Sequence, residues 1–223
     1  MVIMNINMTT RRYEIVLFLI VLLSIVLSFA YYNDMPEKMT SHWNASGQVD
    51  GYMSRLWAMA LMPIILAITN ALFILIPKID PLKANIEKFK GAYYGFIIVF
   101  SVFLLAMHYW MILWNLKIEI GMNFFLPVFL AVMFFFMGIL CEKSKRNWFI
   151  GIRTPWTLSS DVVWQKTHKL GAKLFKYTAV IILAGMFFSY YMIYFILVPA
   201  IGTAAITTVY SYIVYRREKR LAA

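Results

Sequence analysis

Long apolar blocks separated by short polar segments dominate this chain. The apolar runs cover residues 13–32, 56–76, 92–114, 123–141, 177–197 and 200–215. Runs of roughly 20 apolar residues are long enough for a helix to cross the ~30 Å hydrocarbon core of a bilayer. The pattern therefore predicts an all-α polytopic membrane protein with about six transmembrane helices.

The composition agrees with this prediction and gives the spans a direction. The chain is 62% hydrophobic and 14% charged, with a mean hydropathy of +0.73. Most Lys and Arg residues fall in the N-terminus, the second loop, the central loop and the C-terminal tail. The positive-inside rule then places both termini in the cytoplasm of a multi-pass cell-membrane protein. Because the net charge of +11 follows this topology, nucleic acid is a poor explanation for it, whereas anionic lipid suits it.

The first apolar run allows two interpretations. Arg11-Arg12 precede it and Ser28-Phe29-Ala30 could form a cleavage site, as in a secretory signal peptide. However, the run is long for a signal core, and Tyr31 and Tyr32 resemble interface anchors. We therefore favour an uncleaved span.

The spans group into two expected units. A two-span unit covers residues 1–91 and carries an outer motif loop at 33–55, and a four-span unit covers 92–223 and carries a cytoplasmic motif loop at 142–176. Pro199 breaks the last apolar stretch, so we place the boundary between the fifth and sixth spans there. Polar residues inside spans, such as Asn70 and Ser101, are expected to hydrogen-bond one another or the backbone.

The cytoplasmic loop carries the densest motif. Gly151 permits backbone conformations that other residues avoid. Pro155 fixes its own φ angle and favours an extended backbone at Thr154. Arg153 thus lies on a stiff turn, where its guanidinium can meet a carboxylate, a phosphate or carbonyl groups. A helix should follow, capped by Thr157, Ser159 or Ser160, with Asp161 at the positive end of its dipole.

The helix that follows this turn is predicted to be amphipathic. At about 100° per residue, two sets of side chains fall on opposite faces. One face carries Trp164, His168, Gly171 and Phe175, and the other carries Lys166, Lys169, Lys173 and Lys176. The sequence predicts an interfacial helix before the fifth span, whose lysine stripe meets anionic lipid or an acidic partner. A solvated charged face is the alternative for the lysines, and structural packing is the alternative for Arg153 and His168.

The outer loop is polar and rich in turn signals. Gly47 and Asp50-Gly51 mark turns, and His42, Trp43 and Asp50 could hold a ligand. A single histidine with scattered carboxylates lacks the spacing of metal ligands. We therefore expect neither a metal nor a cofactor.

Both motif loops resemble one known family. The central segment resembles the signature of the SdpI family at Asn147, Gly151, Arg153, Thr154, Pro155, Trp156, Thr157, Trp164, Thr167, His168 and Gly171. The outer loop resembles an uncharacterised membrane domain common at the N-terminal end of that family, at Met35, Pro36, His42, Trp43, Asn44, Gly47, Asp50 and Gly51. With the general layout of spans, the resemblance extends to nearly the whole chain.

The resemblance implies a role in immunity. The family is named for a membrane protein that protects cells from a secreted, sporulation-delaying peptide toxin and holds a transcriptional repressor at the membrane. The leading hypothesis is a non-enzymatic sensor or immunity protein that meets a peptide toxin outside and a repressor inside. Two alternatives stay open: a membrane enzyme in which Arg153 binds the phosphate of a lipid head group and His168 transfers protons, and a small transporter. The sequence does not indicate the oligomeric state.

Overall fold

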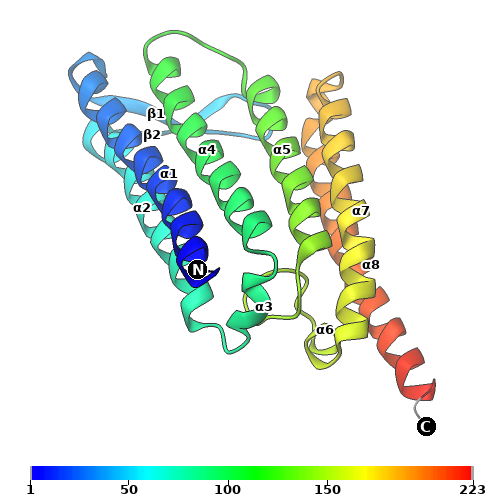
Figure 1. Cartoon of the computed structure of the whole chain (residues 1–223). Helices are drawn as coiled ribbons and strands as arrows, with labels where there is room; N and C mark the ends of the chain where they lie inside the picture. Colours follow the sequence, from blue (N-terminus) through cyan, green and yellow to red (C-terminus); the bar gives the residue numbers. More distant parts are fainter. Residues whose placement is uncertain (1, 222–223) are drawn as a thin grey trace. The chain divides into compact units, whose positions relative to one another are not determined.

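The computed structural model describes residues 2–221, which are mostly helical (Figure 1). The elements are α1 (Val2–Tyr31), η1 (Tyr32–Asp34), β1 (Lys38–Trp43), β2 (Val49–Ser54), α2 (Arg55–Ile79), α3 (Lys83–Glu87), α4 (Lys90–Asn115), α5 (Met122–Lys143), α6 (Pro155–Ser159), α7 (Asp161–Gly185), η2 (Ser189–Tyr191) and α8 (Met192–Leu221). They form two compact units. The first unit comprises residues up to 74 and 97–126, and the second comprises 75–96 and 127 onward. The division expected between residues 91 and 92 stays a prediction.

Five of the described helices are long and apolar enough to cross a membrane. They are Thr10–Asp34, Arg55–Ile79, Lys90–Asn115, Met122–Lys143 and Ser189–Leu221. The first four predicted spans are thus confirmed as apolar helices, and the chain is a multi-pass membrane protein. Helix α7 is not among the five, because it carries four lysines between residues 166 and 176. A sixth crossing and the orientation of the termini stay predictions.

The boundary predicted at Pro199 is wrong. Helix α7 ends at Gly185, and α8 begins at Met192 and contains Pro199 in its second turn. Gly185 allows the close approach that starts the reversal, since a Cβ there would lie 2.5 Å from Cβ of Phe195. The amphipathic segment is the first part of the continuous helix α7, and its interfacial position stays a prediction.

The outer loop is a β-hairpin, which corrects the all-α expectation. Strands β1 and β2 are antiparallel, with Lys38 opposite Ser54 and Trp43 opposite Val49. Gly47 lies in the connecting turn with φ of 78°, so this turn prediction is confirmed. The turn predicted at Asp50-Gly51 is wrong, because both residues belong to β2.

The hairpin packs against helix ends within the first unit (Figure 1). Met39 is buried in a cluster with Met59 of α2 and Ile112 of α4. The Asn115 side chain pairs with the backbone of Thr40, accepting from its N–H at 2.9 Å and donating to its carbonyl at 3.0 Å. These contacts fix the hairpin to the ends of the spans.

Several polar side chains within the spans of this unit pair with one another, as predicted for Asn70 and Ser101, although Asn70 Nδ2 and His108 Nδ1 have no hydrogen-bond partner among the described residues. Ser101 Oγ donates to Asn70 Oδ1 at 2.7 Å, and both residues are buried. His108 Nε2 lies 2.9 Å from Ser28 Oγ. Pairing of this kind offsets the cost of polar atoms in an apolar environment.

Candidate functional site

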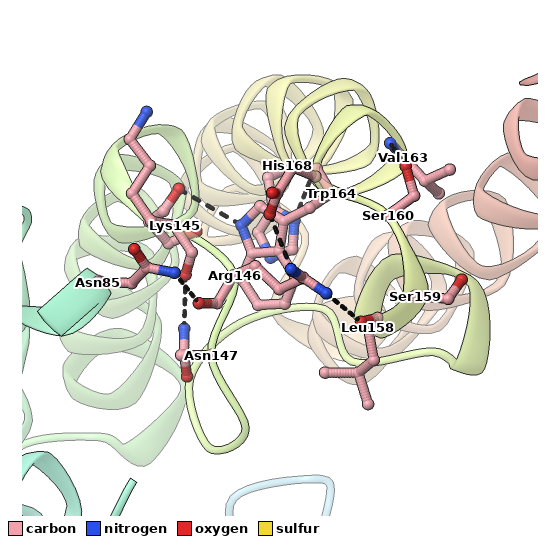
Figure 2. Close-up of polar contacts among 12 residues, drawn as sticks. Asn85, Lys145, Arg146, Asn147, Leu158, Ser159, Ser160, Val163, Trp164 and His168 are labelled. Atoms are coloured by element: carbon pink, nitrogen blue, oxygen red, sulfur yellow. Dashed lines mark hydrogen bonds and ion pairs between the residues drawn. The ribbon is translucent and has the colours of Figure 1, made fainter. Parts of the chain in front are cut away.

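The motif segment, residues 144–171 of the second unit, contains a turn held by the buried Asn147, which Figure 2 labels. Its side-chain oxygen accepts the backbone N–H groups of Phe149 at 3.0 Å and Ile150 at 2.6 Å. Its amide donates to the carbonyls of Lys145 at 2.8 Å and Ile150 at 3.0 Å. Asn147 is fully buried, so it acts as a local scaffold that holds this turn.

Two residues from the preceding basic loop hold the same turn. Asp80 is 2% exposed, and its carboxylate accepts the N–H of Trp148 at 2.9 Å and that of Leu82 at 2.6 Å. Asn85 donates to the carbonyl of Arg146 at 2.9 Å (Figure 2). Neither residue is among those that the sequence motif predicts for this site. The Asp80-Pro81 pair is a turn signal that could have drawn attention to the first.

Gly151 and His168 form the closest contact in the motif segment. Gly151 has φ of 109°, and a Cβ there would lie 2.5 Å from His168 Nε2. The N–H of Ile152 donates to Nε2 at 2.9 Å, and Nδ1 lies 2.9 Å from the Trp164 carbonyl. Because a backbone N–H can only donate, Nε2 is the acceptor and the proton sits on Nδ1. Both ring nitrogens of the neutral imidazole are therefore occupied.

The surroundings of His168 keep it neutral. Its ring stacks on Trp164 with centroids 4.0 Å apart and an interplanar angle of 15°. Burial lowers the pKa of His168 to about 4, against the opposing effect of the hydrogen bond to the Trp164 carbonyl. A neutral imidazole without a free nitrogen is poorly suited to the proton transfer that the enzyme alternative requires.

Two helix caps continue the motif segment. Thr154 caps α6 in a reciprocal box with Thr157, and Pro155 occupies the first turn. Ser160 caps α7 by accepting the N–H of Val163 at 3.3 Å, which confirms the third of the predicted caps. Asp161 lies in the first turn of α7, as predicted.

Both caps also contact α8. Thr154 Oγ1 lies 3.0 Å from Ser211 Oγ, and Ser160 Oγ lies 2.7 Å from a carboxylate oxygen of Glu218. The indole of Trp156 packs against the ring of Tyr212, with centroids 5.1 Å apart. The start of each helix in the motif segment is thus joined to the same long helix.

The two arginines of the segment differ in role. Arg153 is exposed, and its Nη1 donates to the Trp148 carbonyl at 2.8 Å, one of the three partner types predicted for it. Arg146, which is not among the residues predicted from the sequence, joins three parts of the segment. Its Nε lies 2.8 Å from Asp161 Oδ1, and its Nη1 donates to the Leu158 carbonyl at 3.0 Å (Figure 2). One basic residue among many gives no sequence signal for this position.

The predicted faces of α7 are confirmed in their main features. The buried face includes Trp164, Thr167, His168 and Gly171, and a Cβ on Gly171 would lie 2.4 Å from Ile152 Cδ1. On the other face Lys166, Lys169 and Lys173 are exposed. Lys176 pairs with Glu142 at 2.6 Å. The lysine stripe therefore contains three cations that form no ion pair within the described residues.

The outer-loop motif, in the first unit, separates into exposed and buried parts. His42 Nδ1 lies 2.6 Å from Asp50 Oδ1, with side chains 71% and 43% exposed. Gly51 lies opposite His42, and a Cβ there would lie 2.7 Å from His42 Cβ. Pro36 is exposed, whereas Trp43 is buried against Trp110 with ring centroids 4.3 Å apart. The structure thus brings His42 and Asp50 together and places Trp43 in the core.

Comparison with known proteins gives matches in both motif regions. Residues 19–67 match a family model described as a domain of unknown function (DUF1648), and residues 143–211 match the SdpI/YfhL protein family. The chain is 22% identical over 205 residues to Immunity protein SdpI of Bacillus subtilis (strain 168), covering 92% of this chain and 96% of that protein. No solved structure matches. Both motif regions thus match family models, and the chain is similar to Immunity protein SdpI along almost the full length of both proteins.

Proposed function

We propose that this protein confers immunity to a secreted antimicrobial peptide. The observation that carries the proposal is the similarity to Immunity protein SdpI over nearly the full length of both chains. The exposed His42–Asp50 pair on the hairpin supplies polar groups that a peptide can meet, and the aromatic contacts of Trp43 hold the strand behind it.

Expression in a Bacillus subtilis strain that lacks its own Immunity protein SdpI tests this function. Survival beside cells that secrete the corresponding toxin is the measurement. Restored survival with the intact chain, and reduced survival with His42→Ala and Asp50→Ala together, is the expected result. Equal sensitivity of cells with and without the intact chain, at confirmed membrane levels of the protein, contradicts the proposal.

In this proposal, the protein also recruits a cytoplasmic regulator to the membrane. The support is the row of Lys166, Lys169 and Lys173, which is exposed on a helix whose opposite face is fixed by buried contacts. Three unpaired cations spaced along one helix face suit an acidic protein surface. The hairpin and the lysine stripe would then lie on opposite sides of the membrane, with both termini in the cytoplasm.

Recruitment is tested by reversing the charge of the stripe. The triple variant Lys166→Glu, Lys169→Glu and Lys173→Glu should release a fluorescently tagged repressor from the membrane. The matched control changes Lys78, Lys83 and Lys219 to Glu, which are exposed lysines outside the stripe. Equal recruitment by both triples rejects the stripe as the docking surface. Reporter fusions that found positions 42 and 168 in one compartment would reject transmission across the membrane.

A further inference from the structure

We propose that the second unit contains a binding site for a phosphate-bearing anion, which goes beyond the proposed function. The site is a cavity of about 250 Å³ between α3, the loop after α5 and the start of α7. We call it the basic cavity. Its polar lining residues are Asn85, Lys88, Lys145, Arg146, Asp161 and Gln165, next to the indole of Trp164. This volume lies slightly below the roughly 300–1,000 Å³ of pockets for drug-sized ligands, so it suits a small ionic group.

The frame of the basic cavity is fixed by hydrogen bonds. Asn85 donates to the Arg146 carbonyl at 2.9 Å and accepts from Lys88 Nζ at 3.1 Å. The guanidinium of Arg146 is held by Asp161 and by the Leu158 carbonyl. A site with positioned walls loses less conformational entropy when a ligand binds.

Several donors in this frame have spare capacity. The Lys145 ammonium and the Gln165 amide form no hydrogen bond within the described residues, and both side chains are exposed (Figure 2 labels Lys145). Lys88 uses one of its three N–H donors on Asn85. Unused cationic and amide donors that line one cavity are the groups that bind an oxyanion.

The charge of the lining favours phosphate over a carboxylate. Lys88, Lys145 and Arg146 contribute three positive charges, and Asp161 contributes one negative charge, which leaves two positive charges. A phosphate monoester carries about −1.5 to −2 at neutral pH and offers three acceptor oxygens. A single carboxylate would neutralise only half of this excess.

The position of the cavity suggests where the phosphate comes from. Lys88 lies two residues before the candidate span Lys90–Asn115, and Lys145 lies two residues after the candidate span Met122–Lys143. The ends of spans lie near the level of lipid head groups. A phospholipid head group and soluble phosphate share the chemistry that the cavity recognises, and the experiment separates them.

The test uses the whole protein and two probes. In one arm, purified protein in detergent is titrated with sodium phosphate at constant ionic strength, and the shift of the thermal midpoint gives the affinity. In the other, the protein is mixed with phosphatidic acid or phosphatidylcholine, and bound lipid is measured by native mass spectrometry. The cavity variant is Lys88→Gln with Lys145→Gln. The control is Lys78→Gln with Lys219→Gln, which removes the same charge outside both the cavity and the lysine stripe.

The cavity variant should bind the phosphate probe at least about tenfold more weakly than the control, because two charge-assisted contacts are lost. Binding of phosphatidic acid alone supports the site and identifies lipid as the source, whereas binding of inorganic phosphate identifies a soluble ligand. All four lysines are exposed, so both variants should fold. Equal weakening in the two variants overturns the proposal. So does an unaltered protein that shows neither a thermal shift with sodium phosphate nor stronger binding of phosphatidic acid than of phosphatidylcholine.

Discussion

The hairpin of the first unit and the motif segment of the second unit each present a histidine, and the two differ in almost every physical respect. His42 lies on an exposed strand, and its Nδ1 lies 2.6 Å from Asp50 Oδ1. His168 is 2% exposed, and both of its ring nitrogens are bonded to backbone groups. The difference teaches that a histidine in a signature motif can be either an accessible polar group or a structural bridge. Four predictions test this contrast.

The largest effect is expected at Gly151, which provides the space for His168. Gly151→Ala should lower the free energy of unfolding by more than about 3 kcal/mol, because the positive φ and a clash with the imidazole act together. The measurement is thermal or denaturant unfolding in detergent. Gly95→Ala is the control, since a Cβ at Gly95 meets nothing within 4 Å. A similar stability for the two variants would show that the ring moves aside at little cost.

Replacing the histidines themselves should give the next largest difference. His168→Ala should destabilise the protein by about 3 kcal/mol, through a cavity beside Trp164 and an unpaired Ile152 N–H. His42→Ala should change stability by less than about 0.5 kcal/mol, as for most exposed positions. Unfolding of both variants under one set of conditions makes the comparison. A large loss for His42→Ala would mean that the hairpin depends on the contact between His42 and Asp50.

The pH dependence of stability should carry the signature of His168. Its folded pKa of about 4 lies below the ordinary value of 6.5, so the unfolded chain binds the proton more readily. The stability that neutral His168 contributes is fully present above pH 6.5 and is lost as the pH falls toward 4. At pH 5 the loss amounts to about 2 kcal/mol. The difference between the unaltered protein and His168→Gln, followed from pH 7 to pH 4, isolates this residue from the carboxylates. A constant difference across that range would contradict a buried neutral imidazole.

The smallest effect concerns the cap that precedes the His168 helix. Ser160→Ala should cost about 1 kcal/mol, because it removes the α7 cap. Ser159→Ala is the matched control, since the Ser159 hydroxyl is exposed and donates only to the nearby Trp156 carbonyl. Amide hydrogen exchange in the first turn of α7 reports the loss directly. Unchanged protection in Ser160→Ala would show that packing alone defines the start of this helix.

Periodicity in the sequence was sufficient to predict the first four helices and the buried face of α7. The first four apolar runs form helices, and Trp164, His168 and Gly171 share a buried face, because burial follows the helical repeat directly. The hairpin was missed because its alternation is interrupted. The register of β1 shifts between Thr40 and His42 and again between His42 and Trp43, which obscures the two-residue period.

The partners of the motif segment could not be predicted from local pattern. Asp80 bonds to Trp148 across 68 positions, and Asn85 bonds to Arg146 across 61. Such pairs depend on how helices pack, and they cannot be predicted from the spacing of residues within one segment. The same applies to the Pro199 boundary, because the close contact between Gly185 and Phe195 that permits the reversal is tertiary.

The double attachment of the motif segment to α8 has a mechanical consequence. Ser211 and Glu218 lie seven residues apart, about two turns of one helix, so they project from nearly the same side of it. Rotation of α8 about its own axis would therefore displace the first residues of α6 and α7 in the same direction. A twist of the long C-terminal helix would therefore act on Thr154 and Ser160, the two residues that begin the helices of the motif segment.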